Sequence, residues 1–190
     1  MKDVTPDLQD FLRQIEAIRT EGHAVCAGLS ESQFNWRPGE RRWSIAECLV
    51  HLNVSVTCVL PAFDRAIEQG RAKGLTGPGP FRYGWLASWI ARSMEPPPRW
   101  RMRTVKIFEV PPGATHALAR VLPEFVAVRD RLAERVRRAD GLDLKRIKVV
   151  SPVSRFFRLP LGAYFAFVIA HERRHLWQAR QVRNAPGFGS

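Results

Sequence analysis

The sequence predicts an all-α fold, a four-helix bundle in which residues 1–190 form a single domain. Four long segments carry apolar residues at three- and four-residue steps, the spacing that places side chains on one face of a helix. No segment shows the convincing alternation of apolar and polar residues that marks a half-buried strand. The chain of 190 residues is 45% hydrophobic and has no internal repeat, which fits one domain with a full core.

The first two helices are predicted over residues 7–29 and 44–69. The apolar face of the first consists of Leu8, Phe11, Leu12, Ile15, Ile18 and Val25. The second opens on a capping box, because Ser44 and Glu47 are three residues apart and can satisfy each other's free backbone donors. Its apolar stripe is wide, so we expect much of this helix to be buried. Pro38 and Gly39 mark a turn in the connection between the two helices.

Residues 70–113 are predicted to form a long, irregular, aromatic-rich excursion between the second and third helices. Glycines and prolines interrupt a short helix-like piece at residues 81–94. The excursion contains Tyr83, Trp85, Trp89 and Trp100. So many aromatic side chains are expected to cover one end of the core or to shape the mouth of a pocket, with core cover favoured.

Two further helices complete the predicted bundle. One covers residues 115–139, with an apolar stripe made by Leu118, Val121, Leu122, Phe125, Val128 and Leu132. The last begins at Pro160 or Leu161, since proline is tolerated in a first turn. It is predicted to stop before Asn184, where the sequence Asn-Ala-Pro-Gly breaks the helical pattern.

The chain is strongly basic, with 30 Lys and Arg against 18 Asp and Glu and a net charge of +12. The cations cluster at Arg41 and Arg42, at residues 99–106, at residues 129–138, and at Arg173 and Arg174 with Arg180 and Arg183. No recognition helix, RNA-binding aromatic motif or Cys/His finger accompanies these clusters. We therefore expect a basic solvated face and no specific nucleic-acid partner.

The compartment is predicted from the lack of an apolar signal segment and of a membrane span, and the redox state from the cysteines. The first residues carry no apolar signal segment, and no uninterrupted apolar stretch reaches the length of a membrane span. The three cysteines, Cys26, Cys48 and Cys58, are odd in number and lie inside helical patterns. We expect a cytoplasmic protein with no membrane partner and with buried free thiols.

The strongest chemical signal is a pair of histidines, His171 and His175, four residues apart in the last helix. Positions i and i+4 differ by only about 40° around a helix, so both imidazoles can point at one cation. The same residues spell the zinc protease pattern H-E-x-x-H, with Glu172 in the place of the water-activating glutamate.

A protease is nevertheless disfavoured. Residues 176–190 contain no His, Asp, Glu or Cys that could supply the downstream third ligand of the common zincins. Glu172 also projects about 100° away from His171, which predicts that it lies on the solvated edge of the helix. A third ligand must therefore come from upstream.

His51 is the natural third ligand. It lies midway along the largely apolar second helix, and metal sites in bundles are built from side chains on facing helices. A lone histidine in such a place is more often a hydrogen-bonded core residue, but the His171 and His175 pair favours a ligand. His23 and His116 lie near helix ends and have no partner in the sequence.

Two sequence blocks resemble the DinB-like, or YfiT-like, family of metal-dependent hydrolases. The first is W-S-x-x-E-x-x-x-H-L, present here from Trp43 to Leu52. The second is H-x-x-x-H followed by a glutamine, present here from His171 to Gln178 and preceded by Pro160-Leu161-Gly162. Together the two blocks are quite specific, and the resemblance covers almost the whole chain.

The resemblance implies an up-down-down-up four-helix bundle with one divalent metal, often nickel or zinc, held by His51, His171 and His175. It also implies frequent homodimers. The activities it implies include thiol transfer and isomerisation with low-molecular-weight thiols such as bacillithiol or mycothiol, although many members have no established reaction. The resemblance therefore fixes neither the substrate nor the metal.

Three neutral imidazoles would leave a divalent cation with its full charge and at least one open position. Such a centre can lower the pKa of bound water or thiol, or polarise an electrophile. No general base can be named, because Glu47 is engaged if the capping box forms and Glu172 points partly away. Gln178 lies on nearly the same helical face as His171, where it can hydrogen-bond a ligand or an imidazole or simply belong to the core.

Two functions from different classes follow from these observations. The first is a metal-dependent enzyme that acts on a small polar substrate by thiol transfer or hydrolysis. The second is a non-catalytic binding or stress-response protein whose histidines are structural and whose basic surface meets nucleic acid or an acidic partner. Titration against duplex DNA at several salt concentrations separates the two.

Overall fold

Helices dominate the computed structural model, which describes residues 5–40, 42–97 and 114–189. Its elements are α1 (Pro6–Cys26), α2 (Glu31–Asn35), α3 (Ile45–Ala72), α4 (Trp85–Arg92), α5 (Leu118–Arg138), β1 (Lys148–Ser151), β2 (Ser154–Pro160) and α6 (Leu161–Arg183). The predicted helical class is confirmed, and each of the four long helices lies where the sequence predicts it to within a few residues.

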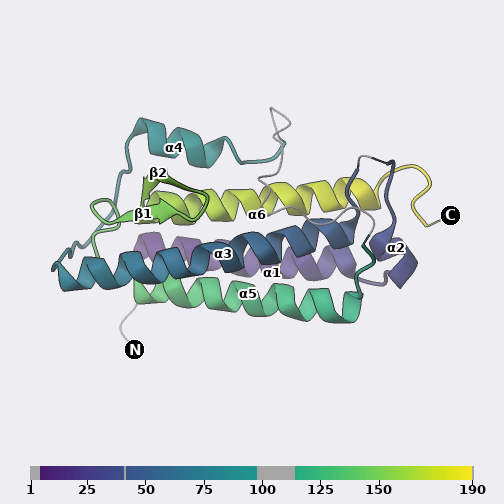
Figure 1. The fold of residues 1–190 in the computed structure, drawn as a ribbon, viewed down its shortest axis with the longest axis horizontal. Helices are drawn as coiled ribbons and strands as arrows, with labels where there is room; N and C mark the ends of the chain where they lie inside the picture. The colour runs from purple at the N-terminus through teal and green to yellow at the C-terminus, as the bar shows by residue number, and fades with distance from the viewer. Residues whose placement is uncertain (1–4, 41, 98–113, 190) are drawn as a thin grey trace.

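Four long helices lie side by side (Figure 1). Both α1 and α3 pack against α5 and α6, so the order around the ring is α1, α5, α3, α6. The colours in Figure 1 show that α1 and α6 run in one direction and that α3 and α5 run in the other. As a result α3 and α6, which carry the candidate ligands, are neighbours, whereas α5 and α6 face each other diagonally.

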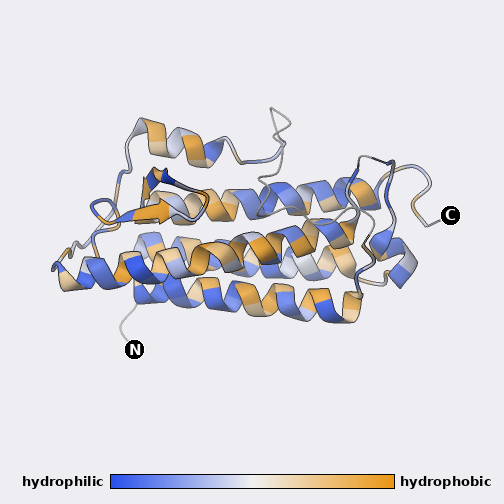
Figure 2. Cartoon of the chain, in the orientation of Figure 1, coloured by the Kyte–Doolittle hydropathy of each residue, from blue (hydrophilic) through white to orange (hydrophobic). Residues whose placement is uncertain are grey.

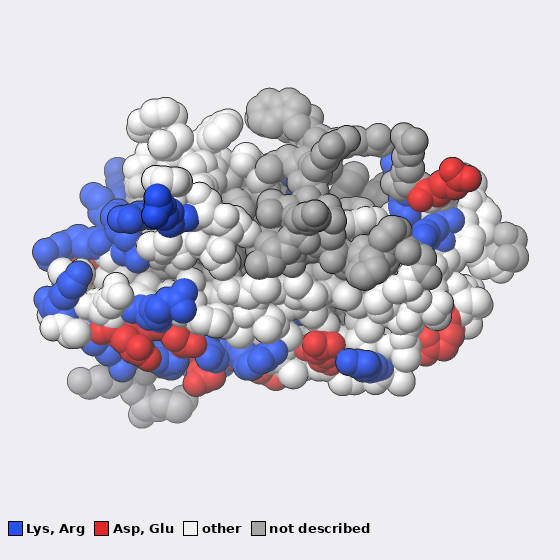
Figure 3. Space-filling view, viewed as in Figure 1, with Lys and Arg blue, Asp and Glu red and all other residues white. Residues whose placement is uncertain are grey.

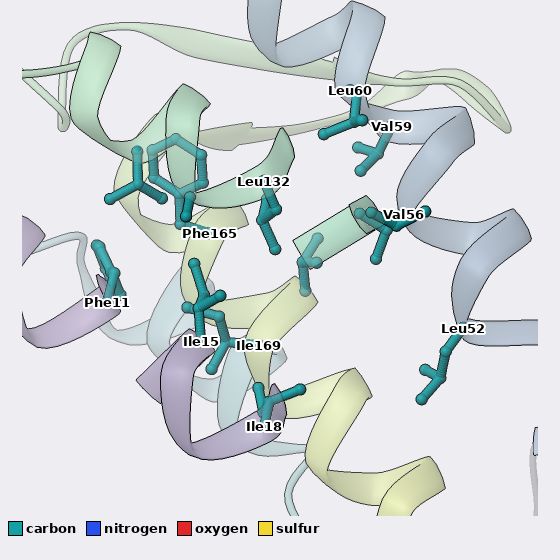
Figure 4. Packing of buried hydrophobic residues seen from close by; sticks show 14 of the residues in the cluster. Phe11, Ile15, Ile18, Leu52, Val56, Val59, Leu60, Leu132, Phe165 and Ile169 are labelled. Carbon is teal, nitrogen blue, oxygen red and sulfur yellow. The ribbon is translucent and has the colours of Figure 1, made fainter. Parts of the chain in front are cut away.

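The apolar faces of the four helices form the core. Figure 4 shows side chains from all four meeting there: Phe11, Ile15 and Ile18 from α1, Leu52, Val56, Val59 and Leu60 from α3, Leu132 from α5, and Phe165 and Ile169 from α6. Figure 2 shows that α3 is hydrophobic over much of its surface, as its wide apolar stripe predicts. Burial of these side chains supplies the main driving force for association of the helices.

Capping boxes fix the start of two helices. The backbone N–H of Glu47 donates to Ser44 Oγ at 3.1 Å, and the N–H of Ser44 donates to Glu47 Oε2 at 2.9 Å, which confirms the predicted start of α3. Ser30 and Gln33 form the same motif at α2, a short helix that the sequence analysis did not predict. The signal was present, since serine followed three residues later by glutamine has the spacing of a capping box.

The structure also contains two strands that the sequence did not predict. Lys148–Ser151 and Ser154–Pro160 pair as an antiparallel hairpin. β1 alternates between exposed and buried residues, but it is only four residues long. β2 keeps most of its side chains at least partly exposed and carries neighbouring Phe156 and Phe157, so it has no clean alternation to detect.

The aromatic excursion divides into two parts. Tyr83 packs against the core as expected, whereas Trp85 and Trp89 on α4 are 80% and 49% exposed and cover no core. The predicted helix-like piece is confirmed as α4, although it is shorter than residues 81–94. Trp100, the basic cluster at residues 99–106 and Arg41 lie outside the described residues.

One helix, α3, bears on the expectation that no apolar stretch reaches the length of a membrane span. α3 is long and apolar enough to cross a membrane by length and composition, the one such helix in the described part of the chain. Because 67% of its most apolar window is buried inside the protein, it has the character of a core helix. Cys26 and Cys48 are buried free thiols, as predicted, and Cys58 is partly buried. Burial raises the pKa of Cys26 to about 12.

A Gly162→Ala substitution is expected to destabilise the protein by about 1–3 kcal/mol, because the new β-carbon would overlap the Tyr83 hydroxyl at the start of α6. Urea denaturation measures the loss. Gly39→Ala is the matched control, since the nearest side-chain atom there is 3.6 Å away. Equal stability of the two variants would contradict the packing of Tyr83 on α6.

Candidate metal centre

Three histidines converge between α3 and α6. His51 lies on α3, and His171 and His175 lie one turn apart on α6. The Nε2 atoms of His51 and His171 are 3.3 Å apart, and one ring nitrogen from each histidine lies within 4.8 Å of the others. The sequence analysis predicted this grouping, and the structure brings all three residues together. His23 and His116 lie outside it.

The spacing of these nitrogens suits a single metal ion. Two imidazole nitrogens bound tetrahedrally at about 2.0–2.1 Å from one ion are about 3.3 Å apart, which matches the distance between His51 and His171. In addition, Nδ1 of His175 is buried and has no hydrogen-bond partner among the described residues. A buried polar nitrogen in this state is costly unless a ligand or an ion satisfies it.

Trp43 and Ser55 complete the surroundings of the histidines. The Trp43 ring centroid lies 4.9 Å from that of His51 and 5.5 Å from that of His175, on which it stacks at 23°. Ser55 Oγ lies 3.3 Å from His51 Nε2. The sequence analysis assigned neither residue to the site. The signal for Ser55 was its position four residues after His51, on the same helix face.

The site favours neutral imidazoles. Burial lowers the pKa of His171 to about 3, and the neighbouring His51 adds to this shift. Burial also lowers the pKa of His175 well below its ordinary value, with a further contribution from His171, while the neighbouring Gln178 amide acts in the opposite direction. Neutral imidazoles have a free lone pair, the form that binds a metal ion.

Acid is therefore expected to destabilise the metal-free protein well above the pH at which carboxylates titrate. Between pH 6.5 and 3 the unfolded chain protonates His171 and the folded protein does not, so stability falls as pH falls. For this one group the free energy of unfolding should drop by about 2 kcal/mol between about pH 7.5 and about pH 5. Urea denaturation of chelator-treated protein measures it. His171→Gln should flatten the dependence, and an unchanged slope would contradict the assignment.

The prediction that Glu172 lies on the solvated edge of α6 is wrong. Glu172 is fully buried, and so is its partner Arg129 from α5. Arg129 Nε and Nη2 donate to the two carboxylate oxygens at 2.7 and 2.6 Å, a bidentate geometry. Arg129 Nη1 also donates to Asn53 Oδ1 on α3 at 2.6 Å. The network therefore joins α5 to α6 across the diagonal of the bundle and ties both to α3.

Neither glutamate near the histidines is available as a general base. The carboxylate of Glu172 is held by Arg129, so it cannot activate water as the glutamate of a zinc protease does. Glu47 accepts the Ser44 N–H, and its oxygens also accept from Arg37 at 2.9 and 2.5 Å. The protease alternative is thus disfavoured by the contacts as well as by the missing downstream ligand.

Many arginines predicted to form a solvated basic face are instead engaged within the bundle. Arg129 is fully buried, and further ion pairs join Arg135 and Arg138 to Asp64, Arg173 to Glu95, and Arg180 to Glu21. These pairs connect different elements and hold the arginines in place. The clusters at residues 129–138 and 173–183 are therefore only partly solvated.

The comparisons with known proteins agree with the two sequence blocks. The family model of the DinB superfamily matches residues 14–179, a span that includes all three histidines. No curated protein and no solved structure matches the chain.

Proposed function

Because the chain belongs to the DinB superfamily, we propose that it is a metal-dependent enzyme that acts on a small polar substrate. His51, His171 and His175 hold one divalent cation, zinc or nickel. The observation that carries the proposal is the convergence of three ring nitrogens within 4.8 Å, with His51 buried and His171 and His175 partly buried. Neutral imidazoles at matching spacing are the donor set that such an ion requires.

The reaction proposed is transfer of a low-molecular-weight thiol or hydrolysis. A cation at this site supplies electrophilic activation of a bound thiol, water or carbonyl group. The chain's own contribution is to hold three uncharged imidazoles in place, to pack Trp43 against two of them, and to keep Glu47 and Glu172 out of the reaction. The positive charge of Arg174 also lowers the pKa of both His171 and His175, so it helps to keep the two imidazoles uncharged.

The fold assignment follows the same family. We assign α1, α3, α5 and α6 to the up-down-down-up bundle that the resemblance implies, within one DinB-like domain spanning residues 1–190. The ring order of the four helices and their directions, with α1 and α6 running one way and α3 and α5 the other, support the assignment. The described apolar residues also form one continuous core cluster rather than two.

Metal content and thiol conjugation test the proposed function. Protein purified without a metal-affinity tag is expected to carry about one zinc or nickel ion per chain by elemental analysis. Conjugation of bacillithiol or mycothiol to a small electrophile should depend on that ion, stopping after chelation and returning when zinc or nickel is restored. A preparation that binds neither ion would overturn the proposal. Full metal occupancy with no thiol transfer would leave hydrolysis as the reaction.

A further inference from the structure

Exposed apolar side chains gather at one place on the molecule. Six large hydrophobic residues are exposed among those that the structure describes, and all lie on α4 or the hairpin: Trp85, Leu86, Trp89, Val150, Val153 and Phe156. Trp85 and Phe156 are 80% and 82% exposed. These two residues and Leu86 line a groove of about 450 Å³ between α4 and β2. Exposed aromatic residues at this density indicate a surface that is covered in use.

The two chain segments that contain α4 and the hairpin carry basic side chains and no acidic ones. Residues 77–94 and 144–160 contain no Asp or Glu and seven cations: Arg82, Arg92, Lys145, Arg146, Lys148, Arg155 and Arg158. None of the seven forms an ion pair with a described residue, unlike the arginines of α5 and α6 discussed above. Figure 3 shows Lys and Arg atoms gathered around the hairpin end of the molecule. We call the exposed residues of these two segments the apolar-basic patch.

We propose that the apolar-basic patch docks the protein on the surface of an anionic lipid bilayer. Tryptophan and phenylalanine partition into the zone between headgroups and acyl chains, and lysine and arginine are attracted to anionic headgroups. Arg155 and Phe156 combine the two kinds of side chain at one place, because the Arg155 guanidinium carbon lies 5.0 Å from the Phe156 ring centroid. The lack of an uninterrupted apolar stretch of spanning length predicted no membrane partner, but docking on a bilayer surface needs no such stretch.

Charge complementarity selects the bilayer over a second copy of the chain. In a symmetric dimer the same patch faces itself, so its seven cations would meet the same seven on the partner. Like charges brought together at a contact that excludes water oppose association. An anionic surface satisfies both the cations and the aromatic side chains. The proposal does not depend on the histidine cluster, since none of its residues belongs to that site.

Vesicle flotation of the full-length, metal-loaded protein tests the proposal. The protein is expected to float with vesicles of phosphatidylcholine and phosphatidylglycerol and not with phosphatidylcholine alone. The double variant Trp85→Ser/Phe156→Ser should reduce the partition coefficient by at least about tenfold. The triple variant Lys148→Ser/Arg155→Ser/Arg158→Ser should reduce it by about fivefold for each cation removed.

A matched control separates this patch from general positive charge. The variant Arg120→Ser/Arg131→Ser/Arg137→Ser removes the same charge from exposed positions on α5, on the opposite side of the bundle from α4. It should retain most of the binding. Equal losses in the two triple variants would overturn the proposal, as would failure of the wild-type protein to float with anionic vesicles. It would also be overturned if Trp85→Ser/Phe156→Ser converted a dimer to a monomer in light scattering, because the occupant would then be a second copy.

Discussion

A His51→Ala substitution is expected to lower the affinity of the protein for zinc or nickel by more than roughly 100-fold. Removing a residue that only hydrogen-bonds to a metal ligand costs up to about 100-fold in metal affinity, and loss of a ligand itself should cost more. His51 is the only one of the three clustered histidines that comes from α3. Without it the ion keeps two protein ligands from one helix, and closed or catalytic zinc sites use at least three. Competition titration against a chromophoric chelator measures the change.

Two variants make this result specific. His23→Ala removes the same ring from an exposed position in the last turn of α1, outside the cluster, and should leave metal affinity unchanged. His51→Gln preserves most of the buried volume, so a loss of metal shared by the Ala and Gln variants cannot come from a cavity. Retention of wild-type affinity in both would remove α3 from the site and with it the proposed function.

Glu172→Ala is expected to lower the free energy of unfolding by about 3–5 kcal/mol, because it leaves the Arg129 guanidinium buried without its counter-ion. Both side chains are fully buried, so solvent cannot compensate the stranded charge. Asn53 and the Phe125 carbonyl would still accept from Arg129, but neither carries a charge. Urea denaturation of metal-free protein isolates this effect from any change in metal binding.

The double variant Arg129→Met/Glu172→Met distinguishes a stranded charge from simple loss of packing. Replacing a whole buried ion pair by apolar residues of similar volume often costs little, so the double variant should be more stable than Glu172→Ala. Equal stability of Glu172→Ala and of the double variant would show that the loss of unfolding free energy comes from packing. A loss below about 1 kcal/mol in Glu172→Ala would contradict the buried network itself.

The helices and the histidine cluster could be predicted because each has a local signature. Apolar spacing located the four long helices, and the Ser44 capping box fixed where α3 begins. The spacing of His171 and His175 placed two rings on one face of α6. The third ring, that of His51, could be predicted because a pair of metal ligands on one helix of a bundle needs a further ligand from a facing helix.

The buried ion pair could not be predicted in the same way, because a helical period gives the direction of a side chain and not what lies across the core. Glu172 is offset by about 100° from His171, and that offset fits a solvated edge as well as a second buried face. One clue was available. Arg129 follows Phe125 by four residues and precedes Leu132 by three, so it sits within the apolar stripe of α5.

The hairpin and the exposed part of α4 were hidden for a different reason. Several of their large apolar residues face solvent, so burial on one side of β2 and α4 does not impose a regular pattern on the sequence. Phe156 and Trp85 look like core residues in the sequence alone. Only the structure shows that they project outward beside cations, which is the basis for proposing a lipid-facing surface.

X-ray absorption at the metal edge of the loaded wild-type protein tests the central claim most directly. The spectrum is predicted to show three imidazole nitrogens at about 2.0–2.1 Å, with the multiple scattering typical of histidine rings and a light atom in the remaining position. His51→Ala protein loaded at saturating metal should show two. A wild-type spectrum with a sulfur ligand, or with fewer than three imidazoles, would contradict the account.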